Sequence, residues 1–320
     1  MGTNMNQTAI LFPGQGAQRE GMGRDFYEEF PIARQTYEAA SDAIDVDLKA
    51  ISFAEDDPRL HLTEFTQPAI LTNEIAVYRV ACLELGLNPG WFAGHSLGEY
   101  AALVAAGALN FSDAVRIVHK RGALMQAAVP AGLGGMAALK LEGLLKVEAV
   151  RDAIVRGEVE IANYNSDSQV VISGRAAGIA AVRERLARDV PRLEFVELPV
   201  SAPFHCGMMR RIEAPFRAWL DQFDCSPLSA ARVLSNFTGR PHPATREELF
   251  DNLVRQISGP VRWTENMQWI EAESDGDILE LGPGRPLGGF FLRQGFAPPP
   301  SIVTVRCLRK AAKSRGQAVA

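Results

Sequence analysis

The feature that constrains this sequence most is a short turn between an apolar segment and an alanine-rich segment. Residues 91–93 are apolar, residues 94–98 form a G-x-S-x-G pentapeptide, and a helix-forming stretch follows at residues 100–109. Small residues at both ends of the pentapeptide relieve crowding where the chain reverses. We therefore expect a strand, a sharp turn and a helix, which is a unit of α/β proteins.

Other segments repeat this alternation of strand and helix. Residues 8–12 are apolar and lead into a glycine-rich loop at residues 13–16, which predicts a buried strand followed by a tight turn. Long helical patterns occupy residues 26–44, 67–85 and 112–129. Together these patterns predict an α/β layer architecture with a mainly parallel sheet.

Between residues 130 and 200 the pattern changes to shorter elements. The sequence predicts strand, helix, strand, strand, helix and strand at residues 136–141, 142–156, 159–163, 169–173, 176–189 and 193–200. This βαββαβ order is that of a ferredoxin-like unit. We expect a small ferredoxin-like domain at residues 131–200, inserted into a large α/β-hydrolase-like domain at residues 1–130 and 201–308, with the functional cleft between them.

Charge and composition exclude several classes of function. With 47% hydrophobic and 22% charged residues the chain is ordinary for a globular protein, and its net charge of -5 gives no basic footprint for nucleic acid or an anionic membrane. No apolar run approaches the ~20 residues that span a bilayer. Residues 1–7 lack the basic flank and apolar core of an export signal.

The four cysteines are scattered and contain no C-x-x-C pair, which argues against a metal site and a disulfide framework. A reducing cytoplasm fits this pattern best. Residues 309–320 carry four basic side chains and are expected to form a flexible, solvated tail, although a basic tail could also contact an acidic partner.

The pentapeptide matches the nucleophile elbow, in which a strained turn exposes a serine hydroxyl at the start of a helix. Ser96 is then a candidate nucleophile, and the next backbone N–H can bind an oxyanion. The alternative is a structural serine in a tight turn. The apolar strand before it and the helix after it favour the nucleophile.

A serine hydroxyl needs a neighbouring base to accept its proton, and the chain has five histidines. His61, His95, His119 and His242 lie in segments that give each a plausible structural role. His205 follows the last strand of the predicted small domain, where the chain returns across the cleft. Position favours it as the base, and a packed or surface histidine is the alternative.

Arg121 lies on an apolar helix face. Residues of this face recur at helical spacing: Ala114, Val118, Arg121, Met125 and Ala128. A buried guanidinium is costly unless it meets an anion, and its planar fork suits a carboxylate. A substrate carboxylate is one candidate; a structural pair with a core Asp or Glu, or a stem that reaches water, is the other.

These residues belong to a longer series of motifs. In order, the series comprises Phe12-Pro13-Gly14-Gln15-Gly16, Thr66-Gln67-Pro68-Ala69, Gly94-His95-Ser96-Leu97-Gly98-Glu99, Arg121-Gly122, Asn163-Tyr164-Asn165-Ser166, Pro203-Phe204-His205, Ser235-Asn236, Val254-Arg255-Gln256 and Gly282-Pro283-Gly284. Over nearly its whole length the chain resembles malonyl-CoA:acyl-carrier-protein transacylases and the related acyltransferases of polyketide synthases, including stand-alone enzymes that act in trans.

The resemblance implies that Ser96 is the nucleophile and His205 its base. No acidic third member is expected, because a main-chain carbonyl near Gln256 orients the imidazole in this family. The backbone N–H groups of Gln15 and Leu97 would form the oxyanion hole.

The resemblance also implies two determinants of substrate choice. Arg121 would bind the malonyl carboxylate. Phe204 stands where housekeeping fatty-acid enzymes more often have serine, and a phenylalanine before the histidine is similar to malonyl-selective polyketide acyltransferases. Its bulk should exclude a 2-methyl branch; ordinary packing in the cleft is the alternative.

The implied reaction is ping-pong: malonyl-CoA acylates Ser96, coenzyme A leaves, and the phosphopantetheine thiol of an acyl carrier protein accepts the malonyl group. No permanently bound cofactor or metal is expected, and a monomer is the expected state. The resemblance leaves fatty-acid and polyketide synthesis open.

Three other functions were weighed. A serine hydrolase of the α/β-hydrolase kind usually places its histidine late in the chain, whereas about a third of this chain follows His205. An editing acyl hydrolase on the same fold has no need for the charge of Arg121. A catalytically silent docking module for carrier proteins has no need for Ser96 and His205.

Overall fold

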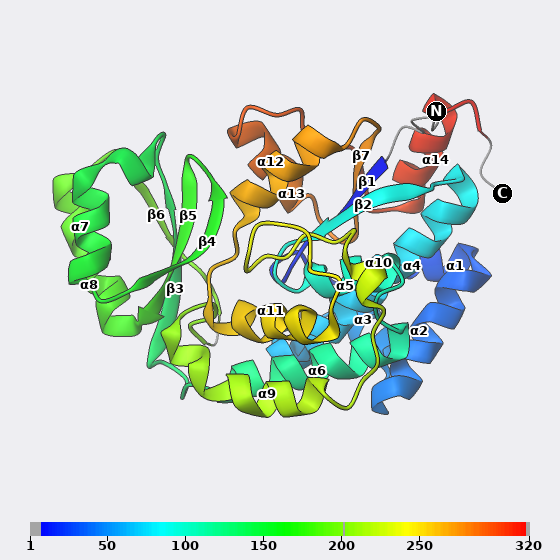
Figure 1. The fold of residues 1–320 in the computed structure, drawn as a ribbon, viewed down its shortest axis with the longest axis horizontal. Coiled ribbons are helices and arrows are strands. Elements are labelled where there is room, and N and C mark those ends of the chain that lie inside the picture. The colour runs from blue at the N-terminus through cyan, green and yellow to red at the C-terminus, as the bar shows by residue number, and fades with distance from the viewer. Residues whose placement is uncertain (1–7, 201, 318–320) are drawn as a thin grey trace.

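A computed structural model describes residues 8–200 and 202–317 (Figure 1). Three of the sequence-based expectations fall partly or wholly outside these ranges. They concern the lack of an export signal at residues 1–7, the domain boundary at residue 201 and the last residues of the tail, 318–320.

The first layer is a parallel sheet. Its strands are β1 (Thr8–Phe12), β2 (Pro89–Gly94), β7 (Ile278–Leu281) and β8 (Ser301–Ile302), in the order β2-β1-β7-β8. Every pairing in this sheet is parallel, and Phe12 is paired with Gly94. The carboxyl ends of β1 and β2 therefore lie side by side, and the loops that follow them meet at one edge of the sheet.

Helices surround this sheet (Figure 1). They are α1 (Arg24–Glu29), α2 (Pro31–Ile44), α3 (Leu48–Phe53), η1 (Pro58–His61), α4 (Thr63–Leu85), α5 (Gly98–Ala105), α6 (Phe111–Ala127), η3 (Gly207–Ile212), α9 (Glu213–Leu220), α10 (Pro227–Ala230), α11 (Arg246–Ser258), α12 (Trp263–Glu273), α13 (Pro286–Arg293) and α14 (Val305–Ser314). The helix predicted at residues 26–44 is divided at Phe30, because Pro31 occupies the first position of α2 and has no N–H to continue α1.

The second layer is an antiparallel sheet at one end of the molecule (Figure 1). Its strands are β3 (Gly134–Lys140), β4 (Glu160–Ser166), β5 (Gln169–Arg175) and β6 (Glu194–Glu197), in the order β4-β5-β3-β6. The helical elements between them are η2 (Leu144–Lys146), α7 (Glu148–Arg156) and α8 (Ala176–Asp189). The chain is thus a mixed α/β protein with one parallel and one antiparallel sheet.

The two faces of the antiparallel sheet pack against different parts of the protein. Ala137, Leu139, Val170 and Ile172 point to α7 and α8 and form a separate hydrophobic core with them. The alternate residues of β3 and β5 point to the other face, toward the larger unit. The predicted last strand, residues 193–200, is shorter in the structure, because pairing with β3 ends at Glu197.

The two units are joined by main-chain hydrogen bonds. Val261 N donates to Ala162 O at 2.8 Å, and Tyr164 N donates to Val261 O at 2.9 Å. These bonds attach β4 to the segment between α11 and α12. The carboxyl end of α11 therefore lies beside the small unit.

The expected tail differs from the structure over residues 309–314. These residues belong to α14, whose Leu308 and Ala312 are buried, and Arg309 lies 2.6 Å from Glu29 in an ion pair. Apolar residues recur at helical spacing among the basic residues of this segment. They form a stripe that packs the helix against the larger unit.

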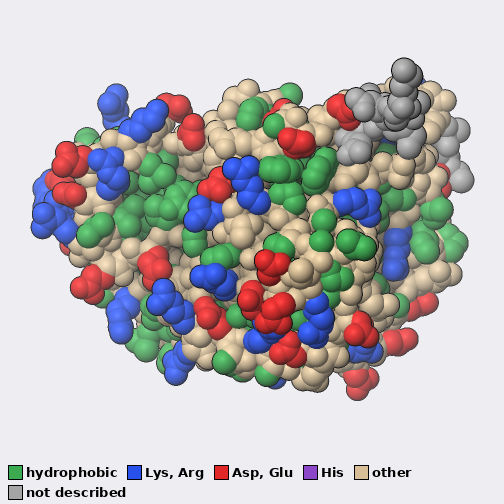
Figure 2. Space-filling model, in the orientation of Figure 1, with side chains coloured by type: hydrophobic (Ala, Val, Ile, Leu, Met, Phe, Trp, Pro, Cys, Tyr) green, Lys and Arg blue, Asp and Glu red, His purple; other side chains and the backbone are tan. Residues whose placement is uncertain are grey.

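Charged side chains of both signs are interspersed on the face shown in Figure 2. Within residues 8–200 and 202–317, no helix is both long enough and apolar enough to cross a bilayer.

The docking of α14 gives a first prediction. Leu308→Ala should lower the free energy of unfolding by about 2 to 5 kcal/mol, because the change leaves a cavity in a closed core. Chemical denaturation measures this difference, with Lys310→Ala, which removes an exposed side chain of the same helix, as the control. Equal stability of both variants would show that α14 is not docked in solution.

Candidate active site

Ser96 lies at the turn between β2 and α5, and its backbone is strained. Its φ is 51°, in the left-handed region that non-glycine residues rarely occupy. A Cβ on Gly94 would lie 1.9 Å from the carbonyl carbon of Gly98, and one on Gly98 would lie 2.3 Å from Phe12 O. Both glycines are therefore required by close backbone contacts, and the turn holds the serine hydroxyl at the cavity wall.

His205 contacts this serine directly. Ser96 Oγ lies 2.7 Å from His205 Nε2, and His205 Nδ1 lies 2.7 Å from the main-chain oxygen of Gln256. A carbonyl oxygen only accepts hydrogen bonds, so Nδ1 carries the hydrogen and Nε2 presents a lone pair to the serine hydroxyl. The geometry is that of a nucleophile and its general base.

The environment of His205 keeps it uncharged. Burial, and after it the nearby positive charge of Arg121, lower the pKa of this imidazole from 6.5 to about 3. A neutral imidazole at pH 7 is the form that accepts a proton.

Arg121, on α6, is 1% exposed, so its stem does not reach water. Its Nη1 donates to Gln67 Oε1 at 2.9 Å, and its Nη2 donates to Gln256 Oε1 at 2.8 Å and approaches Ser96 Oγ at 3.3 Å. Among the described residues no carboxylate pairs with this guanidinium, and its Nε has no acceptor. The arginine is held by neutral amides beside the serine, with its charge unpaired.

Two backbone amides of the loops after β1 and β2 are free to bind an oxyanion. Leu97 follows Ser96 in the elbow, and Gln15 follows β1 in the loop beside it. Neither amide N–H donates a hydrogen bond to another residue in the described ranges. Two free donors on adjacent loops could hold the oxygen of a tetrahedral intermediate.

These groups line one cavity of about 260 Å³ between the two units. Ser96, His205, Arg121 and the buried Phe204 line it from the larger unit. Apolar side chains also line it: Met136, Ala138, Val171, Leu198 and Val200. The cavity thus combines an activated serine, a free cation and an apolar wall.

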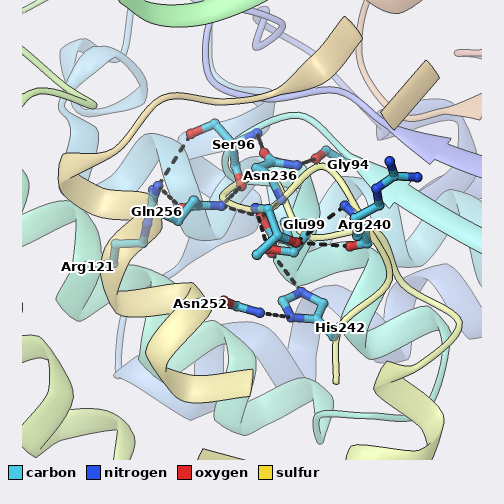
Figure 3. Close-up of polar contacts among 11 residues, drawn as sticks. Gly94, Ser96, Glu99, Arg121, Asn236, Arg240, His242, Asn252 and Gln256 are labelled. Atoms are coloured by element: carbon cyan, nitrogen blue, oxygen red, sulfur yellow. Dashed lines mark hydrogen bonds and ion pairs between the residues drawn. The ribbon is translucent and has the colours of Figure 1, made fainter. Parts of the chain in front are cut away.

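A buried polar network lies beneath the serine (Figure 3). Asn236 Oδ1 accepts from Ser96 N at 2.5 Å, and Gln256 Nε2 donates to Ser96 O at 2.9 Å. Glu99 accepts from both Gln256 and Asn236 and also contacts His242.

Glu99, Asn236 and the side chain of Gln256 have no role predicted from the sequence. Glu99 and Asn236 belong to the motif series, and a carboxylate in the first turn of an otherwise apolar helix is a further signal for Glu99. No sequence pattern indicates that His242, 143 residues away, contacts Glu99.

His95, the other histidine of the cavity, has structural surroundings. His95 Nε2 lies 2.8 Å from Asn165 Oδ1, its ring packs against Trp263 and Phe290, and burial lowers its pKa to about 4.

Among the described residues, no three His, Cys, Asp or Glu side chains gather as a metal site requires. The four cysteines are free thiols.

An α/β fold with an activated serine after a parallel strand is an arrangement found in enzymes that carry acyl groups on serine. The profile of the family described as "Acyl transferase domain" matches residues 10–282. A malonyl CoA-acyl carrier protein transacylase of Bacillus subtilis (strain 168) is 39% identical over 287 residues, which cover 89% of each chain. This chain belongs to the acyl transferase domain family.

Solved structures agree with this assignment. The malonyl-CoA:acyl carrier protein transacylase of Xanthomonas oryzae pv. oryzae is 36% identical, with a TM-score of 0.88 over 98% of this chain and 99% of that one. A malonyl-transacylase solved in complex with its type II PKS acyl-carrier protein is 33% identical, with a TM-score of 0.86 over 96% and 99% of the two chains. The resemblance inferred from the motifs is confirmed.

The low pKa of His205 gives a second prediction. Because the base must be neutral, kcat/KM for acylation of the serine should stay constant as the pH falls through 6.5, and should decline only at clearly lower pH. Stopped-flow release of coenzyme A across this range measures the profile, with circular dichroism as the control for unfolding. An acid limb centred near pH 6.5 would mean that the imidazole is solvated when it reacts.

Proposed function

We propose that this chain transfers a malonyl group from malonyl-CoA, through Ser96, to the phosphopantetheine thiol of an acyl carrier protein. One observation carries the proposal: a serine 2.7 Å from a histidine nitrogen shares a cavity with a buried arginine that pairs with no carboxylate of the described residues. The names of the similar proteins, malonyl CoA-acyl carrier protein transacylases, support the substrate and the acceptor.

The first half-reaction begins when Ser96 Oγ attacks the thioester carbonyl carbon and its proton passes to His205 Nε2. The negative charge that develops on the carbonyl oxygen is held by the N–H groups of Gln15 and Leu97. The intermediate then expels the sulfur of coenzyme A, which takes the proton from His205, and the malonyl group remains on the serine.

The second half-reaction reverses these steps with a different thiol. The phosphopantetheine thiol gives its proton to His205 Nε2 and attacks the malonyl ester, and the serine oxygen takes the proton back as it leaves. The main-chain oxygen of Gln256 keeps the imidazole oriented in both steps. The enzyme is then restored without any bound cofactor, and the kinetics are ping-pong.

Selection for malonyl rests on two side chains in this proposal. Arg121 binds the free carboxylate, which supplies the anion that the guanidinium lacks in the free enzyme. Phe204 narrows the cavity beside the base and disfavours a 2-methyl branch. A contact of this kind discriminates one methyl group by only about 1 to 3 kcal/mol, so the preference should be moderate.

The carrier protein belongs to fatty-acid or polyketide synthesis. One similar enzyme was solved with a type II PKS acyl-carrier protein, which supports the polyketide alternative as well as the fatty-acid one. We place the reaction in the cytoplasm and expect a monomer.

We also propose that the chain forms two domains of known fold type. The antiparallel order β4-β5-β3-β6 with two helices on one face supports a ferredoxin-like domain at residues 131–200. The elbow after a parallel strand supports an α/β-hydrolase-like large domain at residues 1–130 and 201–308.

Intact-mass spectrometry after mixing with a panel of acyl-CoAs tests the proposed function. The wild-type protein should acquire one malonyl group, and Ser96→Ala should acquire none. His205→Ala should acquire it several orders of magnitude more slowly, because residues that act as a unit lose most activity when either is removed. Acylation of Ser96→Ala at the normal rate would refute the nucleophile, and rapid loss of the acyl group to water would favour the editing hydrolase.

Arg121→Ala should cut malonyl kcat/KM by roughly 30- to 5,000-fold, because a partly buried bidentate pair loses one partner. Acetyl loading should not fall in parallel, since acetyl has no carboxylate. Arg121→Lys should restore only part of the loss, because an ammonium lacks the planar fork. The malonyl to acetyl ratio of kcat/KM tests this role, on protein that thermal melting shows to be folded. An equal fall in kcat/KM for both substrates would show that Arg121 has a structural role instead.

A further inference from the structure

Glu99 is a buried carboxylate that the mechanism above does not use. It lies three residues after Ser96, in the first turn of α5, and is 0% exposed. In the described part of the chain no lysine or arginine forms an ion pair with it. Its Oε1 lies 2.8 Å from His242 Nε2, and its Oε2 accepts from Asn236 N at 3.0 Å and from Gln256 Nε2 at 2.7 Å.

The contacts of His242 favour a charged Glu99. Asn252 Nδ2 lies 3.5 Å from His242 Nδ1, and an amide nitrogen is always a donor, so Nδ1 is the acceptor in this pair. The imidazole hydrogen then lies on Nε2 and is donated to Glu99. A neutral histidine and a carboxylate that accepts three hydrogen bonds together carry one negative charge in the core.

Gln256 connects this negative charge to the positive charge of Arg121 (Figure 3). Its Oε1 accepts from Arg121 Nη2 at 2.8 Å, and its Nε2 donates to Glu99 Oε2. A reversed amide would place a donor against the guanidinium and an oxygen against the carboxylate. Glu99 thereby fixes the amide orientation that holds Arg121, and it balances the arginine charge without touching it.

Glu99 also holds the two residues that clamp the strained serine. Asn236 binds the N–H of Ser96 and donates its own N–H to Glu99, and Gln256 binds the C=O of Ser96. A residue at positive φ costs of order 1 to 3 kcal/mol and persists only when its surroundings impose it. The main chain of Ser96 is thus held on both sides by partners of one carboxylate.

We propose that Glu99 is the positioning residue of this site: it keeps the guanidinium of Arg121 aimed at the malonyl carboxylate and the Ser96 peptide in its strained turn, both through Gln256 and Asn236. This proposal rests on the proposed function. A carboxylate in direct contact with Arg121 would compete with the substrate, whereas a carboxylate one amide away supplies the charge and leaves the guanidinium bound only to neutral oxygens.

The test is Glu99→Gln, which removes the charge and keeps the shape. Malonyl kcat/KM should fall by about 10- to 100-fold, the range seen when an outer partner of a site residue is lost. The malonyl to acetyl ratio should also fall, by about tenfold, because only malonyl uses Arg121. Substitution of a residue that merely supports the fold would lower kcat/KM for both substrates in parallel. An unchanged malonyl to acetyl ratio therefore overturns the proposal.

One further variant keeps the test decisive if Glu99→Gln folds poorly. The double variant Glu99→Gln/Gln256→Glu moves the carboxylate next to Arg121 and keeps the buried charges balanced. Its melting temperature should lie above that of Glu99→Gln, yet its malonyl to acetyl ratio should stay at least tenfold below wild type, since the fork is now occupied. A wild-type ratio in the double variant would show that the place of the charge is irrelevant and would overturn the proposal.

Glu74→Gln is the matched control. Glu74 is a fully buried glutamate of the same unit, and among the described residues neither of its oxygens has a hydrogen-bond partner. Burial raises the pKa of its carboxyl well above the usual value, which favours the uncharged form. Its malonyl to acetyl ratio should equal that of wild type. Failure of the wild-type enzyme to load malonyl in the same assay would overturn the proposed function; wild-type loading with an unchanged Glu99→Gln ratio would overturn the role of Glu99 alone.

Discussion

A buried guanidinium that no carboxylate of the described residues contacts is the constraint on which the site depends. Arg121 is 1% exposed and donates to three neutral oxygens, those of the Gln67 and Gln256 amides and of the Ser96 hydroxyl. An isolated charge in the interior is costly, and burial alone would disfavour it. The structure tolerates the charge because Glu99 lies one amide away and Tyr100 places its ring 5.4 Å from the guanidinium carbon. Within the described residues, the guanidinium is thus left without an anion at the cavity.

Gln256 links Ser96, His205 and Arg121. Its main-chain oxygen accepts from His205 Nδ1, its side-chain oxygen accepts from Arg121, and its side-chain nitrogen donates to Ser96 O. One residue of α11 thus positions three groups that come from three other parts of the chain. Substitutions in these groups should be strongly non-additive, because each change also moves the partner that the others share.

Local patterns predicted the parts of the structure that local physics determines. The G-x-S-x-G turn predicted a strand and helix around Ser96, and the 3.6-residue period placed Arg121 on a buried face. No local pattern could bring His205 to Ser96 over 109 residues, or Asn236 and His242 to Glu99 over more than 130. Those contacts follow from tertiary packing. The tail prediction was wrong over residues 309–314 although a local pattern was present: the buried residues Leu308 and Ala312 recur at helical spacing among the basic side chains of α14.

The attachment of the small unit connects the two walls of the cavity. Val261, which is hydrogen-bonded to both Ala162 and Tyr164, is only five residues from Gln256, so the segment that orients His205 and Arg121 also holds β4. In the proposed reaction the serine and the phosphopantetheine thiol attack the same acyl carbon in turn. Both half-reactions use the same base and the same oxyanion donors. A site that stays assembled serves both steps equally well, because the tetrahedral intermediates differ only in the thiol that enters or leaves. The hydrogen bonds between the units therefore hold the cavity in the form that either thioester requires.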